Sequence, residues 1–342
     1  MVDCDATGME PGQRVALGRS GLLVSRLALG GAPLGGQLLP ADEATATAIV
    51  QRAYALGLRF FDTAPLYGTG RSERRLGSAL RDLPRGEVVL ATKVGRLLRP
   101  AAADGDAPAP VAGGVAPAHR PVFDFSYDGV MRSVEESLSR LGLDRVDVLH
   151  IHDPDRHYDD ACRGAYVALD RLRREKVIRA VGAGMNQAEM LTRFARELEM
   201  DCFLLAGRYT LLDQVALPEL LPLCVEKGIA VIIGGVYNSG ILTDPRPGAT
   251  FNYRPAEPAW LERAQRLAAV CDRHETPLMA AAIQFPLAHQ AVATVLTGVR
   301  SIAELEENER MFRFPVPVAL WDDLRREGLL PDEAPTPGAP QE

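Results

Sequence analysis

The sequence is short of features that would each assign it to a particular class of protein. It has five cysteines in 342 residues, and none of them stands in a Cys-x-x-Cys spacing. Scattered cysteines in an odd number exclude a disulfide framework and indicate reduced thiols in a cytoplasmic protein. No apolar run approaches the roughly 20 residues that a membrane span needs, and residues 1–14 lack the apolar stretch of a signal peptide. We therefore expect neither a membrane protein nor a secreted one.

An excess of positive charge is also missing. The 38 Lys and Arg residues are outnumbered by 45 Asp and Glu residues, which gives a net charge of -7, and no basic cluster stands out. A nucleic-acid-binding surface needs such a cluster, so we expect no nucleic-acid partner. Apolar residues make up 47% of the chain, enough for a sizeable globular core. A small molecule is the expected partner, and the sequence carries no signal for an oligomeric state.

What the sequence does contain is a repeated alternation of strand and helix. The expected strands are residues 26–29, 59–61, 88–93, 146–152, 179–182, 202–206, 230–233 and 292–296. The helices that follow them are expected to begin near residues 41, 72, 127, 162, 187, 218, 260 and 301, with further helices over 276–288 and 318–327. The strands are almost continuously apolar, as a parallel sheet covered by helices requires. Eight such units predict an α/β fold, a closed (β/α)8 TIM barrel rather than an open sheet.

The remaining segments complete the predicted domain organisation. Residues 1–13 are expected to be a flexible N-terminus, and residues 14–330 a single barrel domain that opens with a β-hairpin over 14–24. Residues 96–122 are rich in Ala, Pro and Gly and predict a long loop on the C-terminal face of the barrel, bordering the substrate pocket. The Pro-rich tail, 331–342, is expected to be disordered.

Polar residues end three of the predicted strands. Asp62 ends the second strand, Lys93 the third and His152 the fourth, and Tyr67 follows in the loop after the second. The carboxyl ends of barrel strands converge on one mouth, where Asp62 and Lys93 should pair because either charge alone would be costly to bury. A purely structural ion pair explains these two residues equally well. A nearby ammonium would lower the pKa of Tyr67, which suits proton transfer near neutrality.

These motifs together resemble a known family. The string Phe-Asp-Thr-Ala-Pro-Leu-Tyr-Gly over 61–68 is similar to the aldo-keto reductase signature, and residues 91–93, 147–152 and 298–308 match further family segments. The resemblance runs from about residue 14 to 308. It implies that Tyr67 is the general acid/base, that Lys93 lowers its pKa, and that Asp62 holds Lys93. It also selects His152, rather than His150, as the residue that orients the substrate oxygen, while a nicotinamide exchanges the hydride.

The resemblance further implies a set of cofactor contacts. An Asn near the end of the fifth strand contacts the nicotinamide in the family, and Asn186 is the best match. Ala206 stands where a Gln is common and Gly234 where a stacking Tyr is common, so that Tyr237 is expected to substitute for the latter. The glycine-rich loop after the seventh strand is expected to offer backbone contacts to a pyrophosphate rather than to be a simple tight turn. The candidate cofactor-binding residues are Gly184, Asn186, Tyr237, Asn238, Ser239, Gly240, Gly298, Arg300, Glu304 and Asn308.

The choice between NAD and NADP depends on the last of these segments. Relatives that use NADP commonly place Lys, Ser and Arg over residues 298–304, whereas this chain retains Arg300 and has Glu304 where an Arg is often found. A carboxylate repels a 2′-phosphate and can accept a ribose hydroxyl, which favours NAD and leaves NADP possible through Arg300. These features most resemble the aldose dehydrogenase branch, which includes D-threo-aldose (L-fucose) 1-dehydrogenases and pyridoxal 4-dehydrogenases. The resemblance implies NAD-dependent oxidation of a cyclic hemiacetal to a lactone.

Three other interpretations compete with this one. An NADPH-dependent reductase of aldehydes or ketones would share the fold and every catalytic residue. A metal-dependent hydrolase is suggested by His150, His152 and Asp153, because alternate strand residues face the same way. No further His follows at the later strand ends, so we expect no metal and interpret His150 as a polar residue of the barrel interior. A non-catalytic cofactor-binding module is disfavoured by the four retained residues.

Overall fold

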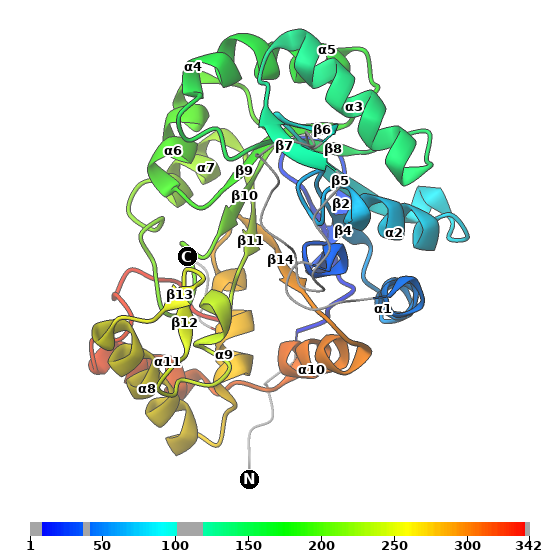
Figure 1. Ribbon diagram of the computed structural model, residues 1–342. Helices are drawn as coiled ribbons and strands as arrows, with labels where there is room; N and C mark the ends of the chain where they lie inside the picture. The colour runs from blue at the N-terminus through cyan, green and yellow to red at the C-terminus, as the bar shows by residue number, and fades with distance from the viewer. Residues whose placement is uncertain (1–8, 37–41, 101–118, 339–342) are drawn as a thin grey trace.

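Eight parallel strands close into a barrel around which the helices are arranged (Figure 1). The structure is a computed structural model that describes residues 9–36, 42–100 and 119–338. Around the barrel, the strand order is β10-β11-β14-β3-β4-β5-β8-β9. The strands are β3 (Leu27–Gly30), β4 (Phe60–Asp62), β5 (Val89–Val94), β8 (Val148–His152), β9 (Ala180–Met185), β10 (Cys202–Ala206), β11 (Ala230–Gly234) and β14 (Val292–Gly298). The predicted (β/α)8 barrel is confirmed.

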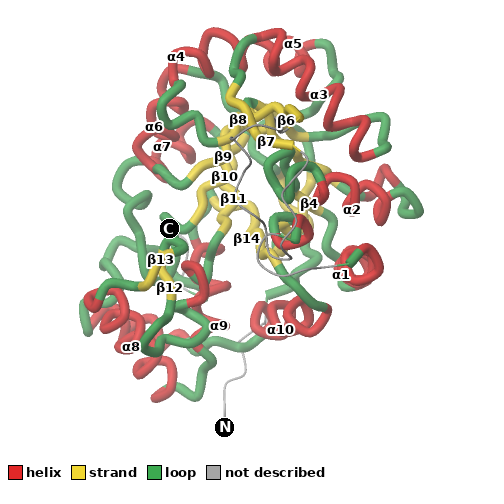
Figure 2. The backbone as a smooth tube through the Cα atoms, in the orientation of Figure 1, coloured by secondary structure: helices red, strands yellow, loops and turns green. Residues whose placement is uncertain are grey.

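The helices lie outside this sheet, as Figure 2 shows by colour. They are α1 (Glu43–Ala55), α2 (Arg71–Leu80), α3 (Tyr127–Leu141), α4 (Tyr158–Asp160), α5 (Val167–Arg174), α6 (Ala188–Glu197), α7 (Leu220–Lys227), α8 (Pro258–Arg273), α9 (Leu278–Gln284), α10 (Ile302–Arg313) and α11 (Val318–Arg326). Local signals set several starts. Asp42, Ser126 and Ser301 each accept a hydrogen bond from the first turn of the helix they precede. Such caps satisfy backbone N–H groups that have no partner within the helix.

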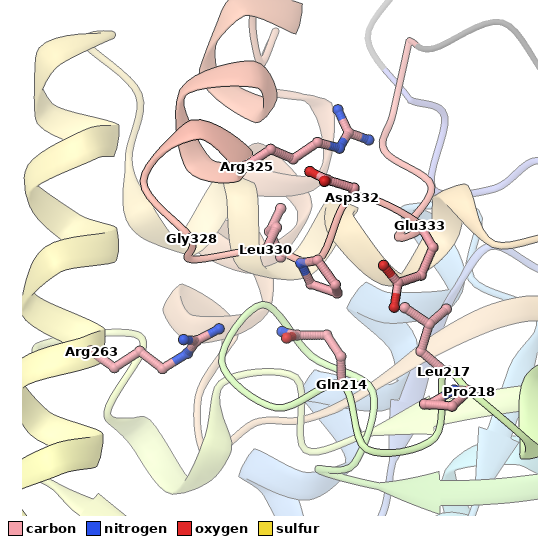
Figure 3. Close-up of a pocket in the computed structure, with 10 residues that line it drawn as sticks. Gln214, Leu217, Pro218, Arg263, Arg325, Gly328, Leu330, Asp332 and Glu333 are labelled. Carbon is pink, nitrogen blue, oxygen red and sulfur yellow. The ribbon is translucent and has the colours of Figure 1, made fainter.

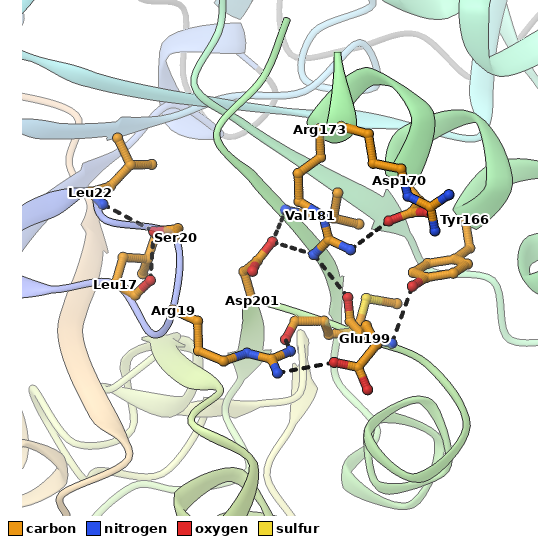
Figure 4. Close-up of polar contacts among 12 residues, drawn as sticks. Leu17, Arg19, Ser20, Leu22, Tyr166, Asp170, Arg173, Val181, Glu199 and Asp201 are labelled. Carbon is orange, nitrogen blue, oxygen red and sulfur yellow. Dashed lines mark hydrogen bonds and ion pairs between the residues drawn. The ribbon is translucent and has the colours of Figure 1, made fainter. Parts of the chain in front are cut away.

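The amino-terminal end of the barrel is closed by the predicted hairpin, β1 (Arg14–Ala16) and β2 (Leu23–Ser25). Its residues Leu17 and Val24 are buried in one apolar cluster with side chains of the barrel interior. Figure 4 shows how the turn is anchored: Arg19 donates to the Glu199 carboxylate at 3.0 Å and to the Met200 carbonyl at 3.1 Å. This end of a barrel serves stability, so the chemistry is to be sought at the opposite end.

Residues 96–122 do not form the simple loop that their composition predicts. Residues of β6 (Arg96–Pro100) pair antiparallel with β7 (His119–Phe123), and the predicted loop residues 101–118 lie outside the described residues. Leu97 and Leu98 are both buried, so this arm has no alternation of apolar and polar residues that could indicate a strand. The predicted loop is therefore wrong at both of its ends.

The predicted disorder of the chain ends is also wrong for the residues described. In the tail, Ala334 and Thr336 are buried, and the Arg325 guanidinium donates to the Ala334 carbonyl at 2.8 Å and to the Thr336 hydroxyl at 3.0 Å. Near the other end, the Leu27 N–H donates to the Pro11 carbonyl at 3.1 Å. Composition suggested disorder, but specific contacts hold the described part of each segment, residues 9–13 and 331–338.

A pocket of about 580 Å³ lies between this tail, α8 and the segment after β10 (Figure 3). Its lining has mixed charge, because it includes Arg263 and Arg325 as well as Asp332 and Glu333. None of the candidate site residues lines it. The site proposed from the sequence therefore has to be examined at the strand ends instead.

Candidate active site

The strand ends bring Asp62 and Lys93 into contact inside the barrel. Asp62 ends β4, and Lys93 lies near the end of the neighbouring strand β5. The Lys93 ammonium lies 2.6 Å from Asp62 Oδ2 and donates to the Thr63 carbonyl at 2.9 Å. Both side chains are almost completely buried, with relative exposures of 1% and 2%. A buried ammonium with a carboxylate and a carbonyl as acceptors is a satisfied charge, as burial requires.

Tyr67 and His152 lie beside this ion pair. The Lys93 Nζ atom lies 4.6 Å from the centroid of the Tyr67 ring. The rings of Tyr67 and His152 meet edge to face, with their centroids 5.9 Å apart. Tyr67 is held in a tight turn in which its N–H donates to the Ala64 carbonyl at 3.1 Å. The structure thus brings together the four side chains that the sequence singled out.

The residues that follow Tyr67 in the signature position this turn. Ser72 donates to the Gly31 carbonyl at 2.7 Å and lies 2.8 Å from the Thr63 hydroxyl oxygen, so α2 begins in contact with the ends of β3 and β4. Glu73 is fully buried, accepts from the Thr92 hydroxyl at 2.9 Å, and is paired with a guanidinium of α3. The serine and glutamate are therefore structural supports of the catalytic turn.

The pKa of Tyr67 departs from the sequence-based expectation. Burial raises the pKa of the Tyr67 phenol, and the Lys93 ammonium opposes this shift without overcoming it. Lys93 thus acts on the pKa of Tyr67 in the expected direction, but the net shift is upward because burial outweighs it. The reason is that desolvation penalises the phenolate more than one ammonium, already paired with Asp62, can offset. Tyr67 is consequently a protonated phenol at neutral pH.

Both histidines of β8 are neutral. Burial, together with the nearby Lys93, lowers the pKa of His152 well below its usual range and the pKa of His150 to about 3. His152 Nε2 lies 3.5 Å from Asp153 Oδ2, which favours the tautomer with the proton on Nε2. His150 faces Gly182, where an added Cβ atom would lie 2.6 Å from its ring, and neither of its ring nitrogens has a partner among the described residues. His150 fills the barrel interior below the tetrad, as we call the four side chains Asp62, Tyr67, Lys93 and His152.

We expect a His150→Leu variant to lose less stability in acid than the wild type. The folded-state pKa of about 3 lies below the unfolded value of about 6.5, so the unfolded chain takes up the proton first and stability falls as the pH drops between these values. From pH 6.5 to 5 the loss linked to this one group is about 2 kcal/mol. Urea unfolding at several pH values measures it. A His119→Gln variant, changed at an exposed position, serves as the control and should lose as much stability in acid as the wild type does. If the His150→Leu variant also loses as much stability as the wild type, the expectation is contradicted.

Glycines shape the mouth of the barrel around this group. Gly184 lies at the end of β9, opposite His152 in register, and a Cβ atom there would lie 3.5 Å from Lys93 Cε. Gly298 ends β14 opposite Gly30, and a Cβ atom on Gly298 would lie 2.8 Å from the ring of Pro33. A side chain at Gly298 would therefore collide with Pro33, and one at Gly184 would press on Lys93, so both glycines let neighbouring groups pack closely at the mouth. Asn186 lies exposed in the loop after β9.

The loop after β11 holds the remaining candidates of that segment. The Tyr237 hydroxyl donates to Asn308 Oδ1 at 2.9 Å, which links the loop to α10. Asn238 is buried and accepts from the Thr210 hydroxyl at 2.7 Å, while its amide donates to the Gly207 carbonyl. Its side chain is thus hydrogen-bonded within the protein, and its N–H donates to the Gly235 carbonyl at 2.9 Å, so the contacts of Asn238 do not favour its predicted role in cofactor binding.

The backbone of the same loop is unusual. Asn238 and Ser239 both have positive φ angles, 45° and 61°, and Gly240 has a φ of 102°. The Ser239 hydroxyl accepts from the Tyr253 N–H at 3.0 Å, and the Ser239 carbonyl accepts from the Thr250 hydroxyl at 2.6 Å. These residues form a tight turn in which the Asn238 N–H donates to the Gly235 carbonyl and the Gly240 N–H to the Tyr237 carbonyl, both at 2.9 Å.

Arg300 and Glu304 form an ion pair with each other. The Arg300 guanidinium contacts Glu304 Oε1 at 2.6 and 2.8 Å, and the Arg300 N–H donates to Glu304 Oε2 at 2.8 Å. The Ser301 hydroxyl caps α10 by accepting from the Glu304 N–H at 3.2 Å. The guanidinium that could bind a 2′-phosphate is therefore already paired with a carboxylate.

The sequence-based reasoning overlooked one ion pair beside the tetrad. Arg96, at the start of β6, donates to Asp153 Oδ2 at 2.7 Å, and this is the oxygen that faces His152. The sequence predicts Asp153 only as a possible metal ligand, and it predicts Arg96 as part of a loop. The signal in the sequence that could have revealed this ion pair is a carboxylate, Asp153, directly after the histidine that ends a strand.

Two findings bear on the competing classes of protein. Within residues 9–36, 42–100 and 119–338, no three potential His, Cys, Asp or Glu ligands gather where they could hold a metal ion. In the same part of the chain, no helix has the length and apolar character needed to cross a membrane.

This barrel, with a tyrosine, a lysine–aspartate pair and a histidine at the ends of β4, β5 and β8, defines the class of a nicotinamide-dependent oxidoreductase. The chain belongs to the aldo/keto reductase family, whose model matches residues 26–326. It is 42% identical to a pyridoxal 4-dehydrogenase of Microbacterium luteolum, over 94% of this chain and 99% of the relative. It is 39% identical to a D-threo-aldose 1-dehydrogenase of a Pseudomonas species, over 92% of this chain and 98% of the relative.

A solved structure supports the same assignment. The holo form of an aldo-keto reductase from Bacillus halodurans superposes with a TM-score of 0.72 at 26% identity, covering 92% of this chain and 95% of the other. The family acts on small molecules with a nicotinamide cofactor, which agrees with the class of reaction and the kind of partner expected from the sequence.

Proposed function

We propose that this enzyme oxidises the cyclic hemiacetal of an aldose, or of a pyridoxal-like compound, to a lactone with NAD. The observation that carries the proposal is the group of Tyr67, Lys93 and His152 at the mouth of a barrel whose two relatives at about 40% identity are dehydrogenases. The carbon that bears the hemiacetal hydroxyl loses a hydride, and the hydroxyl loses a proton. A bound nicotinamide supplies the acceptor for the hydride.

The protein side chains would handle the hydroxyl oxygen and its proton. Neutral His152 donates a hydrogen bond from Nε2 to that oxygen and fixes its position. Tyr67 accepts the proton as a phenolate in oxidation and returns it as a phenol in reduction. Lys93 stabilises the phenolate form, and Asp62 keeps Lys93 charged and in place. The contacts of each residue support the role proposed for it.

The preference for NAD is supported by the ion pair on α10. Glu304 occupies both the side chain and the N–H of Arg300, so a 2′-phosphate would have to displace a carboxylate and then face its charge. A ribose hydroxyl would instead find an acceptor in Glu304. The other cofactor-binding residues that we propose lie at the strand ends, in the loop after β11 and on α10. They are Gly184, Asn186, Tyr237, Gly298 and Asn308.

We expect a Glu304→Gln variant to use NADP better than the wild type does. The change removes the repelling carboxylate and frees Arg300, so the KM for NADP should fall by about tenfold, the effect of one charge–phosphate contact. The KM for NAD should change little, because an amide still accepts a hydroxyl. Steady-state kinetics with both cofactors measure the ratio. The matched control is Glu306→Gln, also on α10, and an unchanged NADP-to-NAD ratio in Glu304→Gln would refute the role of the carboxylate.

The substrate and the cofactor are tested together by one assay. Purified protein is incubated with L-fucose, D-arabinose or pyridoxal and with NAD or NADP, and formation of the reduced cofactor is followed by absorbance. We expect turnover of at least one of these compounds with NAD. Failure with all three would remove the substrate proposal, and a strong preference for NADP would remove the cofactor proposal.

A carbonyl reductase is the second candidate, and the state of Tyr67 favours it. Burial raises the pKa of this phenol, and a protonated phenol is the form that donates a proton to a carbonyl oxygen. Reduction of an aldehyde with NADPH, measured beside the oxidation assay, separates the two directions.

We also propose the cytoplasm as the compartment. Cys162, Cys202, Cys224 and Cys271 are all free thiols, and three of them are buried. Free thiols persist where the surroundings are reducing.

A further inference from the structure

We propose that Asp153, held in place by Arg96, binds the hydroxyl group on the substrate carbon next to the reacting carbon. This inference deepens the proposed function, because it rests on His152 binding the reacting oxygen. Of the two substrate classes in the proposed function it selects the aldoses, as 2-hydroxy carbonyl compounds and their cyclic hemiacetals, over pyridoxal-like compounds, which carry no hydroxyl on the carbon next to the reacting one.

The position of Asp153 is set by the barrel itself. It directly follows the last residue of β8, and its N–H donates to the Gly184 carbonyl at 3.1 Å, so it lies between the ends of β8 and β9. Its Oδ2 atom lies 3.5 Å from His152 Nε2, the atom expected to bind the reacting oxygen. Asp153 therefore places a carboxylate directly beside the atom expected to bind that oxygen.

The spacing of these two groups matches a diol. Oxygen atoms on neighbouring carbons are roughly 3 Å apart, about one hydrogen-bond length. Because Oδ2 of this carboxylate lies only 3.5 Å from His152 Nε2, His152 can donate to the first oxygen while the other carboxylate oxygen, Oδ1, accepts from the neighbouring hydroxyl. A substrate that lacks this hydroxyl leaves the carboxylate without its donor.

Asp153 also keeps an oxygen free for a ligand. Arg96 and His152 both approach Oδ2, and in the described part of the chain no group donates to Oδ1. The side chain is 31% exposed, so a substrate can reach it. Its φ angle is +42°, although it precedes Pro154, where an extended backbone is normal. Backbone strain of this kind persists only where the surrounding contacts hold it.

Arg96 holds the carboxylate in this position and keeps it charged. It donates to Oδ2 at 2.7 Å, and its guanidinium lies 4.7 Å from the centroid of the Phe123 ring on the paired strand β7. Burial raises the pKa of Asp153, and Arg96 opposes the shift. The hairpin β6–β7 thus positions Arg96, and through it Asp153, at the mouth of the barrel. We expect this pair to bind the substrate hydroxyl and to take no part in the proton or hydride transfer.

The test compares substrates that differ by that one hydroxyl. D-Arabinose and 2-deoxy-D-ribose form such a pair for oxidation, and lactaldehyde and propanal form one for reduction. We expect the wild type to favour the hydroxylated member of each pair by roughly 10- to 100-fold in kcat/KM, because the other leaves a charged acceptor unpaired. In Asp153→Gly, which tolerates the positive φ, the ratio should fall to about threefold or less, mainly through KM.

Two further variants sharpen this experiment. Asp153→Asn keeps an acceptor oxygen and tolerates the same backbone, so it should retain an intermediate preference. Asp155→Asn removes a carboxylate two residues away, on the same loop and exposed, and should leave every ratio unchanged.

The outcomes separate this inference from the proposed function. Equal losses on both members of a pair in Asp153→Gly, or a wild type without preference in either pair, would overturn the inference, as would absence of turnover with all four compounds. If the aldehyde pair shows preference dependent on Asp153 while neither sugar is oxidised, the inference stands and the proposed oxidation fails. If the sugars are oxidised without such dependence, the proposed function stands and the inference fails.

Discussion

Replacing Tyr67 with Phe is expected to lower kcat by about 10³-fold while leaving the fold intact. The hydroxyl is the one group of the site placed to move a proton, and general acid–base catalysis contributes about 10² to 10⁴ in rate. The ring itself remains, so its contact with His152 and its position over Lys93 persist. Steady-state kinetics in both directions measure the loss, and binding of the reduced cofactor by fluorescence should be nearly unchanged.

The pH dependence of the wild type gives an independent check on Tyr67. Because burial raises the pKa of this phenol, the phenolate needed for oxidation becomes more abundant as the pH rises, and kcat/KM for oxidation should rise with it. Reduction uses the phenol and should fall over the same alkaline range. The residual activity of Tyr67→Phe should show neither trend. If Tyr67→Phe leaves every measurable turnover unchanged, the interpretation of the protein as a non-catalytic cofactor-binding module would revive.

The local sequence was sufficient to predict the catalytic group because the barrel converts sequence position into spatial position. Asp62, Lys93 and His152 each stand at the carboxyl end of an apolar strand, and parallel closure brings such ends to one mouth whatever the connecting segments do. Tyr67 follows because a short turn limits its reach. The strand pattern alone did not distinguish His152 from His150, and the family resemblance was needed to choose between them.

Other features of the site depend on tertiary burial, which a local pattern does not record. The raised pKa of Tyr67 reflects how deeply the ring is buried. Asn238 looked available until its contact with Thr210, 28 positions away, accounted for its amide. Arg96 was assigned to a loop because the pairing of β6 with β7 spans a segment without periodicity. In each case the deciding partner is distant in sequence.

Replacing Asp62 with Asn is expected to destabilise the fold and to abolish most of the activity. Lys93 would remain buried with a neutral partner, and removing one member of a buried ion pair typically costs about 3 to 5 kcal/mol. Burial alone lowers the pKa of Lys93, whereas Asp62 and Tyr67 raise it above its ordinary value. In the variant the burial effect should prevail, so the ammonium that stabilises the Tyr67 phenolate would be partly lost and oxidation would slow with it.

The sign of the pH effect distinguishes this mechanism from simple loss of packing. In the wild type, the raised pKa of Lys93 contributes stability below the unfolded value of about 10.4, and that stability is lost as the pH rises through the folded-state pKa. In Asp62→Asn, Lys93 has a lowered pKa, so the unfolded chain binds the proton more tightly and stability increases as the pH rises from 7 toward about 10.4. Denaturant unfolding at a series of pH values measures how the free energy of unfolding changes with pH in both proteins. If the wild type and Asp62→Asn show the same slope, Lys93 is not held as a charged partner of Asp62.

A double variant separates stability from chemistry. Lys93→Met removes the buried charge from Asp62→Asn, and a neutral pair of similar volume is often as stable as the ion pair it replaces. We expect the double variant to regain most of the free energy of unfolding and none of the turnover, because no ammonium is left beside Tyr67. Recovery of turnover in the double variant would show that Lys93 acts through packing alone. Recovery of stability without turnover would assign the buried pair to catalysis, because a charge that the fold can dispense with has to be retained for the chemistry it supports.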